Sequence, residues 1–233
     1  MATETTAPDP LRDRFALALD VDDLVEATRL LRELSPWFGV AKVGLELFSA
    51  AGPDAVVACL DEGYRVFLDL KLHDIPTTVG RSARVLGALG VSYLTMHASG
   101  GVPMLMAGVK GLAEGAASAD LEPAIALAVT VLTSDVDAPP HILGKRVQAA
   151  LEARCGGLVC AAADVAEAKE LAPHLVTVVP GIRPAGAPTH DQGRPATPAE
   201  AFASGADLIV VGRAVTAAPS RREAAAALVA SAR

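Results

Sequence analysis

The stretch "RVFLDLKLHDIPTT", residues 65–78, contains the unit that decides the fold. Its first six residues are an apolar, β-rich run typical of a buried strand, and Asp69, Lys71 and Asp74 gather at the carboxyl end of that run. Pro76, followed by two threonines, suits the first turn of a helix, because its ring fixes φ near the helical value and an N–H at that position would have no partner. The stretch therefore predicts a strand, a charged turn and a helix.

The same unit recurs along the chain. The apolar runs are continuous rather than alternating, which is expected of parallel strands covered on both faces. The predicted strands span residues 15–19, 40–43, 65–70, 93–96, 124–132, 157–160, 176–179 and 208–211. Several of the helices between them are expected to end at a glycine in the left-handed conformation just before the next strand. These glycines are Gly39, Gly63, Gly90, Gly156 and Gly205.

Eight such units in one uninterrupted chain predict a single-domain α/β fold, the closed (β/α)8 or TIM barrel. The length of 233 residues and the 52% hydrophobic content fit one large domain with a sizeable core. We expect the barrel to occupy residues 13–233, after a flexible tail over residues 1–12. The proline-rich segments 135–141 and 183–195 are predicted to be loops after the fifth and seventh strands.

Composition excludes several classes of partner. The net charge is -7 and lysines and arginines do not cluster, so neither a nucleic acid nor an anionic membrane surface is expected. No signal-peptide layout and no apolar run of roughly 20 residues is present, so no membrane segment is expected either. Three cysteines without zinc-type spacing favour a reduced, cytoplasmic location.

Polar residues fall at the carboxyl ends of the predicted strands. In a barrel these ends share one rim, where barrel enzymes carry their active sites. The residues are Asp20, Lys42, Asp69, Lys71, His97, Thr133, Arg183 and Arg213.

Structural roles are the alternative for the charged members of this set. Asp20 also fits the N-cap of the next helix. Lys42 and Lys71 also fit ion pairs that neutralise Asp20, Asp69 and Asp74, since buried charges are generally paired. So many charges at strand ends form a costly network if stability is their only purpose, and this favours function.

Other cofactor and catalytic groups have less support. His73 and His97 are interpreted as structural rather than catalytic, because a histidine at a strand end often bonds backbone. No metal is expected, because lysines compete with a cation for Asp69 and Asp74. No glycine-rich dinucleotide motif follows the first strand, so no nicotinamide or flavin is expected.

The segment "VVGRA", residues 210–214, indicates phosphate binding. Gly212 allows close approach to backbone N–H groups, and Arg213 adds a forked donor. Arg183 comes from the loop after the seventh strand, and barrels frequently hold phosphate in the loops after strands seven and eight. A small phosphorylated ligand is therefore favoured.

These motifs together resemble the orotidine 5'-phosphate decarboxylase family over nearly the whole chain. The motif at 67 is highly specific, and the others follow in the family's order. They are "LALDV" at 17, "KVGLELF" at 42, "FLDLKLHDIPTTV" at 67, "HASGG" at 97, "AVTVLTS" at 128, "PGIRP" at 180, "HDQGR" at 190 and "VVGRAVT" at 210. The chain departs from the commonest pattern at Thr77, where many relatives have asparagine, but threonine still suits a helix start.

The resemblance implies decarboxylation of orotidine 5'-phosphate to UMP in pyrimidine biosynthesis, by a homodimer with shared active sites and with neither metal nor organic cofactor. It implies that Lys71 protonates C6 of the pyrimidine and that Asp69 lies beside the substrate carboxylate. Lys42 and Asp74 complete an alternating charge array, with Asp74 coming from the partner subunit.

The resemblance also implies contacts along the rest of the nucleotide. These are Asp20 and Thr78 at the ribose hydroxyls, Thr78 from the partner subunit, Thr133 at the pyrimidine amide edge, Gln192 between base and phosphate, and Arg183, Gly212 and Arg213 at the phosphate.

Two other functions compete with this one. A metal-dependent sugar-phosphate decarboxylase or aldolase of the same superfamily shares the D-x-K-x-x-D motif. Such relatives, however, carry an acidic metal ligand where this chain has Lys42. A nucleotide-phosphate sensor without turnover is the second alternative, and the intact Asp69, Lys71 and Asp74 argue against it.

Overall fold

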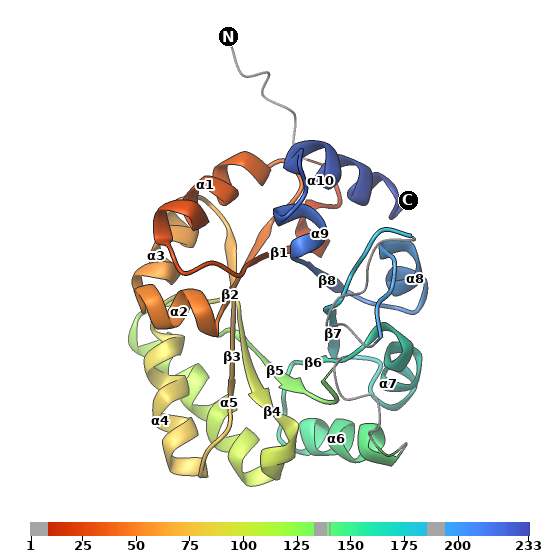
Figure 1. Cartoon of the computed structure of the whole chain (residues 1–233). Helices are drawn as coiled ribbons and strands as arrows, with labels where there is room; N and C mark the ends of the chain where they lie inside the picture. The colour runs from red at the N-terminus through yellow and green to blue at the C-terminus, as the bar shows by residue number, and fades with distance from the viewer. Residues whose placement is uncertain (1–8, 133–138, 140, 186–193) are drawn as a thin grey trace.

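Eight parallel strands close into a barrel in the computed structural model, which describes residues 9–132, 139, 141–185 and 194–233 (Figure 1). Each strand pairs with its neighbours in the sequence, and β8 pairs with β1 to close the sheet. The strands are β1 (Phe15–Leu19), β2 (Val40–Gly44), β3 (Arg65–Leu72), β4 (Tyr93–His97), β5 (Ile125–Val129), β6 (Gly157–Val159), β7 (Val176–Val179) and β8 (Leu208–Val211). The predicted (β/α)8 barrel is confirmed.

Helices surround the barrel, as Figure 1 shows. They are α1 (Leu24–Leu34), α2 (Leu45–Ala51), α3 (Asp54–Asp61), α4 (Pro76–Gly87), α5 (Gly101–Ser118), α6 (His141–Glu152), α7 (Val165–Leu171), α8 (Pro198–Ala203), α9 (Arg213–Thr216) and α10 (Arg221–Ala230). Short 3-10 turns are η1 (Arg12–Arg14), η2 (Ala98–Gly100) and η3 (Ala162–Asp164). No helix in these described ranges is long and apolar enough to cross a membrane.

The strands are buried on both faces, which explains their continuous apolar runs. Side chains between the strands and the helices form the larger core, around Phe15, Leu17 and Leu68. A second cluster, with Phe67 and Tyr93 packed edge to face, fills the barrel interior. The barrel interior is therefore a packed apolar core rather than an open channel.

Five strands have bounds different from those predicted: β2 and β4 end one residue later and β6 ends one residue earlier, while β3 and β5 differ more. β3 runs two residues further, to Leu72, through an irregularity in its pairing with β4. β5 covers residues 125–129 rather than 124–132. The apolar run continues past β5 because Val131 is buried in the following loop, so hydrophobicity alone does not mark the end of the strand.

Side chains cap the starts of two helices. Asp23 caps α1, with its carboxylate accepting the N–H of Val25. This assigns the cap of α1 to Asp23 and not to Asp20. Thr197 and Glu200 form a reciprocal capping box at the start of α8.

The predicted glycine caps are correct at three of five positions, because Gly63, Gly90 and Gly205 have positive φ. Gly39 and Gly156 do not adopt this conformation. A Cβ at Gly39 would collide with the Asp13 carboxylate and lie 3.1 Å from the Asp13 Cα, so the close approach of this segment favours glycine there. Before Gly156, the left-handed residue is Arg154.

Helices α4 and α5 lie unusually close together (Figure 1). A Cβ added at Gly111 would collide with the carbonyl oxygen of Gly80, and one added at Gly115 would collide with that of Arg84. Glycine on α4 has the same effect, since a Cβ at Gly87 would meet a carbonyl of α5. The backbones of the two helices are therefore in direct contact.

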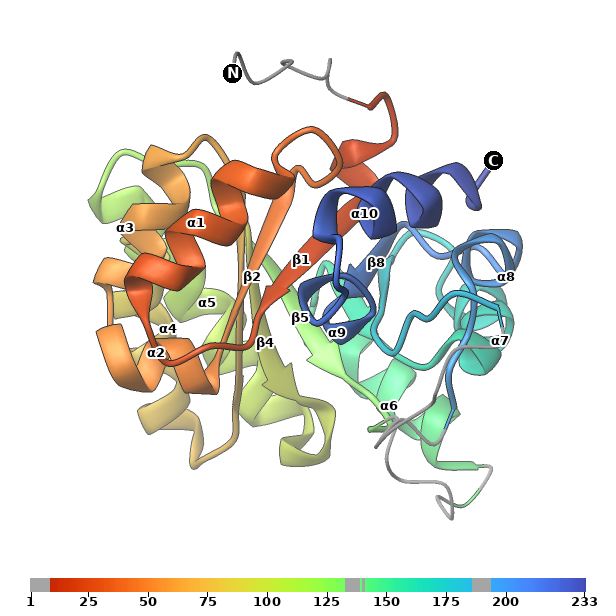
Figure 2. The ribbon, with the colours of Figure 1, turned by 45° about the horizontal axis from the view of Figure 1, so that its top comes forward.

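Both ends of the described chain lie on the same side of the molecule, near α10 (Figure 2). Asp9 Oδ2 forms an ion pair with Arg233 Nη2 at 2.7 Å, and the backbone N–H of Asp9 donates to the carbonyl of Pro36 at 2.8 Å. A flexible tail was expected over residues 1–12, and these contacts belong to its described part, residues 9–12. Residues 1–8 lie outside the described part of the chain.

Candidate active site

A cavity of about 570 Å³ opens at the carboxyl ends of the strands. It brings together predicted residues from β1, β2, β3 and the loops after β7 and β8. These are Asp20, Lys42, Asp69, Lys71, Arg183, Gly212 and Arg213. The carboxyl ends of the strands therefore bring residues from segments far apart in the chain into one site.

Four of these residues alternate in charge along one wall, and we call Asp20, Lys42, Asp69 and Lys71 the charge row. Lys42 Nζ lies 3.0 Å from Asp20 Oδ1 and 4.0 Å from Asp69 Oδ2. Lys71 Nζ lies 2.7 Å from the same Asp69 oxygen. Asp69 thus receives both ammonium groups on one oxygen.

Burial makes the charge row costly. The side chains of Lys42 and Asp69 are only 11% and 13% exposed, and removing charges from water carries a penalty that their attraction repays incompletely. Lys42 starts in the middle of β2, level with Ala18 and Phe67, and its long side chain reaches the rim. The ion pairs of the structural alternative are present, but they line an open cavity rather than a closed core.

The local path of β3 places Asp69 and Lys71 on the same side. Residues two apart on a strand share a face. The pairing with β4 shifts between Leu68 and Leu72, and Lys71 adopts a left-handed φ of 50°, which is rare for a residue other than glycine. Thr95 of β4 bonds both residues across the irregularity, at 2.9 Å to each.

Two arginines, Arg183 and Arg213, give another part of the cavity the positive charge that a phosphate group would need. Arg183 is buried, and its Nη1 donates to the carbonyl of Ile182 at 2.8 Å. Its Nε has no hydrogen-bond partner among the residues that the structure describes. Burial, and then the charge of Arg213, lower the pKa of Arg183, so a bound anion would relieve both effects.

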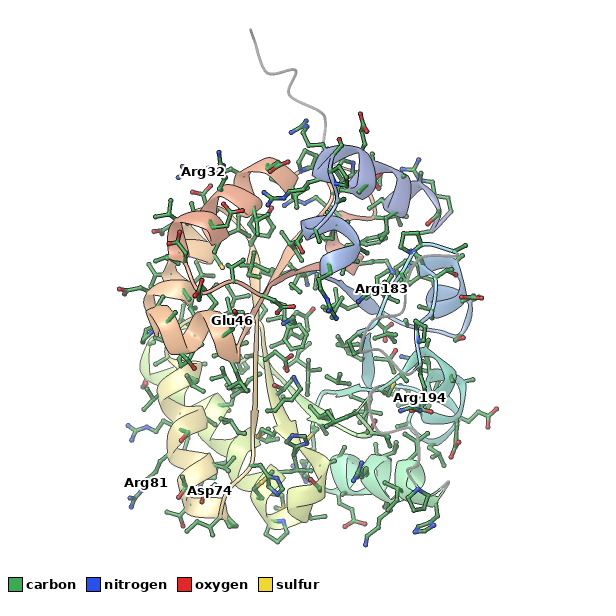
Figure 3. All side chains as sticks on the ribbon, viewed as in Figure 1. Arg32, Glu46, Asp74, Arg81, Arg183 and Arg194 are labelled. Atoms are coloured by element: carbon green, nitrogen blue, oxygen red, sulfur yellow. The ribbon has the colours of Figure 1, made fainter. Side chains whose placement is uncertain are left out.

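Asp74 and Thr78 are not part of this cavity. Both are exposed, Asp74 before α4 and Thr78 in its first turn. Figure 3 shows Asp74 between β3 and α4, away from Glu46 and Arg183, which line the cavity. The carboxylate of Asp74 accepts the N–H of Ile75 at 2.6 Å.

Two predicted contacts lie outside the described residues. Thr133 falls in the range 133–138 and Gln192 in the range 186–193.

The two histidines lie beside the site rather than in it. The rings of His73 and His97 are 5.5 Å apart, and neither lines the cavity. Burial lowers the pKa of His97, and the charges of His73, Lys71 and Arg146 lower it further. His97 is therefore biased toward its neutral form.

A metal centre has little support in this donor set. No three His, Cys, Asp or Glu side chains are grouped to hold an ion within the described ranges. The ammonium of Lys42 stands between Asp20 and Asp69, where it would repel a cation.

Sequence reasoning missed several residues of the site. Glu46, in the first turn of α2, lines the cavity, and so do Phe67, Val159 and Thr216. Thr95, which bonds the charge row from behind, was also missed. Its only signal in the sequence is a polar side chain inside the otherwise apolar start of β4.

Comparison with known proteins gives one consistent result. The profile of the family described as "Orotidine 5'-phosphate decarboxylase / HUMPS family" matches residues 13–228. The chain is 43% identical to the orotidine 5'-phosphate decarboxylase of Moorella thermoacetica, covering 94% of this chain and 92% of that protein. It is 45% identical to that of Anaeromyxobacter sp. strain K, covering 94% and 97%.

Solved structures agree with the sequence comparison. Orotidine 5'-phosphate decarboxylase from Lactobacillus acidophilus superposes with a TM-score of 0.78 at 34% identity, covering 95% of this chain and all of that one. An uncharacterized conserved protein from Geobacillus kaustophilus gives the same TM-score at 31% identity, covering 94% of this chain and all of the other.

Proposed function

The chain belongs to the orotidine 5'-phosphate decarboxylase / HUMPS family, and from this premise we propose how its site works. Its reaction is the decarboxylation of orotidine 5'-phosphate, a carboxy-lyase step of pyrimidine biosynthesis. We propose that the product is UMP, that neither metal nor organic cofactor takes part, and that Lys71 protonates C6. The observation that carries the proposal is the charge row lining the same cavity as Arg183 and Arg213.

The chemistry at C6 requires stabilisation of an anion. When the bond between C6 and the carboxylate breaks, carbon dioxide leaves and the electron pair stays on C6 in the plane of the ring. The Lys71 ammonium attracts this pair and then gives it a proton, after which the amine regains a proton from water. A fixed cation at this position favours the transition state over the bound substrate, which is the requirement for catalysis.

Asp69 has two tasks in this scheme. Its 2.7 Å contact holds the Lys71 ammonium in place, and Lys42 helps to hold Asp69. Asp69 also places a negative charge beside the carboxylate of the substrate, and the departure of carbon dioxide relieves that repulsion. Asp20, which contacts Lys42, is assigned to the ribose hydroxyls.

The arginines bind the phosphate, far from the bond that breaks. The charges of Arg183 and Arg213 repel each other at one end of the cavity, and a bound phosphate would neutralise both. Gly212 adjoins them at the end of β8. Binding energy gained at a remote group can order the substrate at the reacting centre.

The metal-dependent sugar-phosphate enzymes remain the alternative within the same superfamily. They need an acidic metal ligand at the end of the second strand. Lys42 occupies this place and is paired with Asp20, which favours the cofactor-independent reaction. A sensor without turnover is disfavoured because the Lys71–Asp69 pair is intact and lines the open cavity.

A homodimer with shared active sites accounts for Asp74 and Thr78. Both residues are exposed and lie outside the cavity of their own chain, so we propose that they complete the site of the partner subunit. Apolar side chains exposed on and beside α4 support contact of this surface with a second subunit. Ile75 is 66% exposed and Val85 is 67% exposed. The roles of Thr133 and Gln192 and the cytoplasmic location stay predictions.

The deciding experiment is an ultraviolet assay of orotidine 5'-phosphate consumption with purified protein treated with chelator. We expect UMP to form at an undiminished rate after chelation. Turnover that appears only with added magnesium would contradict the cofactor-independent mechanism, and no turnover at all would contradict the function.

A variant in the same assay tests the role of Lys71. Lys71→Ala should lower kcat by orders of magnitude, at least about 10³-fold, while UMP still binds, because the proton donor is lost and the phosphate site is kept. Lys145→Ala, which removes an exposed lysine on α6, is the matched control and should behave as wild type. A Lys71→Ala enzyme with normal kcat would refute the assignment.

A further inference from the structure

We infer that Thr95 is a positioning residue that fixes Asp69 and Lys71 in their catalytic arrangement. The inference rests on the proposed function, because it concerns the same charge row. Thr95 lies in β4 with no exposed surface and does not line the cavity, so it acts on the reaction only through the residues that it holds.

The position of Thr95 follows from the irregular pairing of β3 and β4. Leu68 pairs with Leu94 and Leu72 pairs with Met96, so four positions along β3 advance against two along β4. Thr95 stands opposite this surplus of chain. Its hydroxyl oxygen accepts the backbone N–H of Lys71 at 2.9 Å, so a side chain replaces the carbonyl that a regular sheet would supply.

The direction of each hydrogen bond is determined by chemistry. The N–H of Lys71 can only donate, so the Thr95 oxygen accepts it. The single hydroxyl hydrogen is then left for Asp69 Oδ1, also at 2.9 Å, and an ionised carboxylate accepts it. Thr95 therefore joins the backbone of one catalytic residue to the side chain of the other.

The two carboxylate oxygens of Asp69 have different partners. Oδ1 is held by Thr95, and Oδ2 is held by Lys71 at 2.7 Å. The carboxylate plane is thereby fixed, and with it the direction from which the ammonium approaches. The same hydroxyl holds the left-handed backbone of Lys71, a conformation that persists only where surrounding groups determine it.

Removal of the hydroxyl should impair chemistry and spare binding. Without it, the Asp69 carboxylate can rotate and the Lys71 N–H loses its acceptor, whereas Arg183 and Arg213 are untouched. A displacement of about 1 Å in a catalytic group costs on the order of 100-fold in rate. The expected signature is thus a fall in kcat with KM and UMP affinity nearly unchanged.

The test compares Thr95→Val, which keeps the shape but loses the hydroxyl, with Thr95→Ser, which keeps the hydroxyl. Thr95→Val should lower kcat by about 10- to 100-fold and change KM and the Kd of UMP by less than about threefold. Thr95→Ser should recover kcat to within about threefold of wild type. Thr95→Ala serves as a second hydroxyl-free variant if Thr95→Val does not fold.

The matched control is Thr177→Val in β7. Thr177 is equally buried, and its hydroxyl bonds Gly205 and Asp207, away from the charge row. Thr177→Val should lower the melting temperature without the loss of kcat, which separates a structural effect from a positioning effect. Wild type is assayed alongside, so a failure of the proposed function shows as absent turnover in every protein. With wild type active, a normal kcat in folded Thr95→Val or Thr95→Ala, or no recovery in Thr95→Ser, overturns the inference.

Discussion

His97 gives the surroundings of the site a dependence on pH. Burial and neighbouring cations lower its pKa below the ordinary value of 6.5 in the folded protein. The imidazole of His97 therefore binds a proton more readily in the unfolded chain than in the folded protein. Its contribution to the free energy of unfolding is fully present above about pH 6.5. It is lost as the pH falls toward the folded pKa.

This sign is open to measurement. The free energy of unfolding in urea should decrease between pH 7.5 and pH 5, and His97→Gln should remove part of that decrease. NMR titration of the His97 ring should give a pKa below 6.5, and His73→Ala should raise it by removing one neighbouring charge. A His97 pKa at or above 6.5 would contradict the electrostatic account.

At the scale of residues, the sequence predicts those side chains that follow from position on a strand. Asp69 and Lys71 are two apart at a strand end, and this is enough to place them together on the rim. Thr95 could not be found in this way, because its partners depend on the register between β3 and β4, and the irregularity that brings Lys71 to Thr95 leaves no mark in composition. Glu46 was missed because it comes from a helix rather than from a strand end.

The close pair α4 and α5 makes a prediction at the scale of elements. Gly111→Ala should destabilise the protein by about 1–3 kcal/mol, because the added methyl group would meet the Gly80 carbonyl and force the helices apart. Gly144→Ala in α6 is the control, since its nearest neighbour would be Leu171 Cδ1 at an ordinary 3.8 Å. Better helix propensity should make it about 0.5–1 kcal/mol more stable than wild type.

Urea unfolding of the two variants measures the difference. If both alanines had the same effect, the contact between the backbones of α4 and α5 would not be a source of stability.

The sequence predicts which strands exist more accurately than it predicts where they end. All eight strands were found because parallel strands need continuous apolar runs. The end of β5 was wrong because burial continues into the next loop through Val131, and the caps at Gly39 and Gly156 were wrong because glycine serves more than one purpose. At Gly39 the purpose is space for Asp13, which comes from a segment 26 positions earlier and so lies beyond local pattern.

Shared active sites lead to a prediction for the whole molecule. Lys71→Ala and Asp74→Ala should each be nearly inactive alone. When equal amounts are unfolded and refolded together, a mixed dimer combines the intact Lys71 of one subunit with the intact Asp74 of the other in one of its two sites. Because half of the dimers are mixed, activity should return to about one quarter of wild type.

The control is a mixture of Lys71→Ala with Asp69→Ala, two residues that serve the same site in the same chain. No site in that mixed dimer regains both groups, so activity should stay low. Recovery in both mixtures, or in neither, would contradict the proposed sharing.

The whole barrel could be predicted from the sequence because eight units of one kind leave few ways to close a sheet. The place of Asp74 could not be derived from the same rule. Three positions after Lys71 it has left the rim and lies in the exposed entry to α4, and only the resemblance to a family assigned it to a second subunit.

The ion pair between Asp9 and Arg233 has a consequence for engineering the molecule. It places the two ends of the described chain side by side, on the side of the barrel where β1 begins rather than at the mouth with the charge row. A short flexible linker would therefore suffice to connect position 233 to position 9, and new termini could be opened elsewhere on the surface. A circularly permuted enzyme of this kind would keep the order of strands around the barrel while changing the order in which they are synthesised.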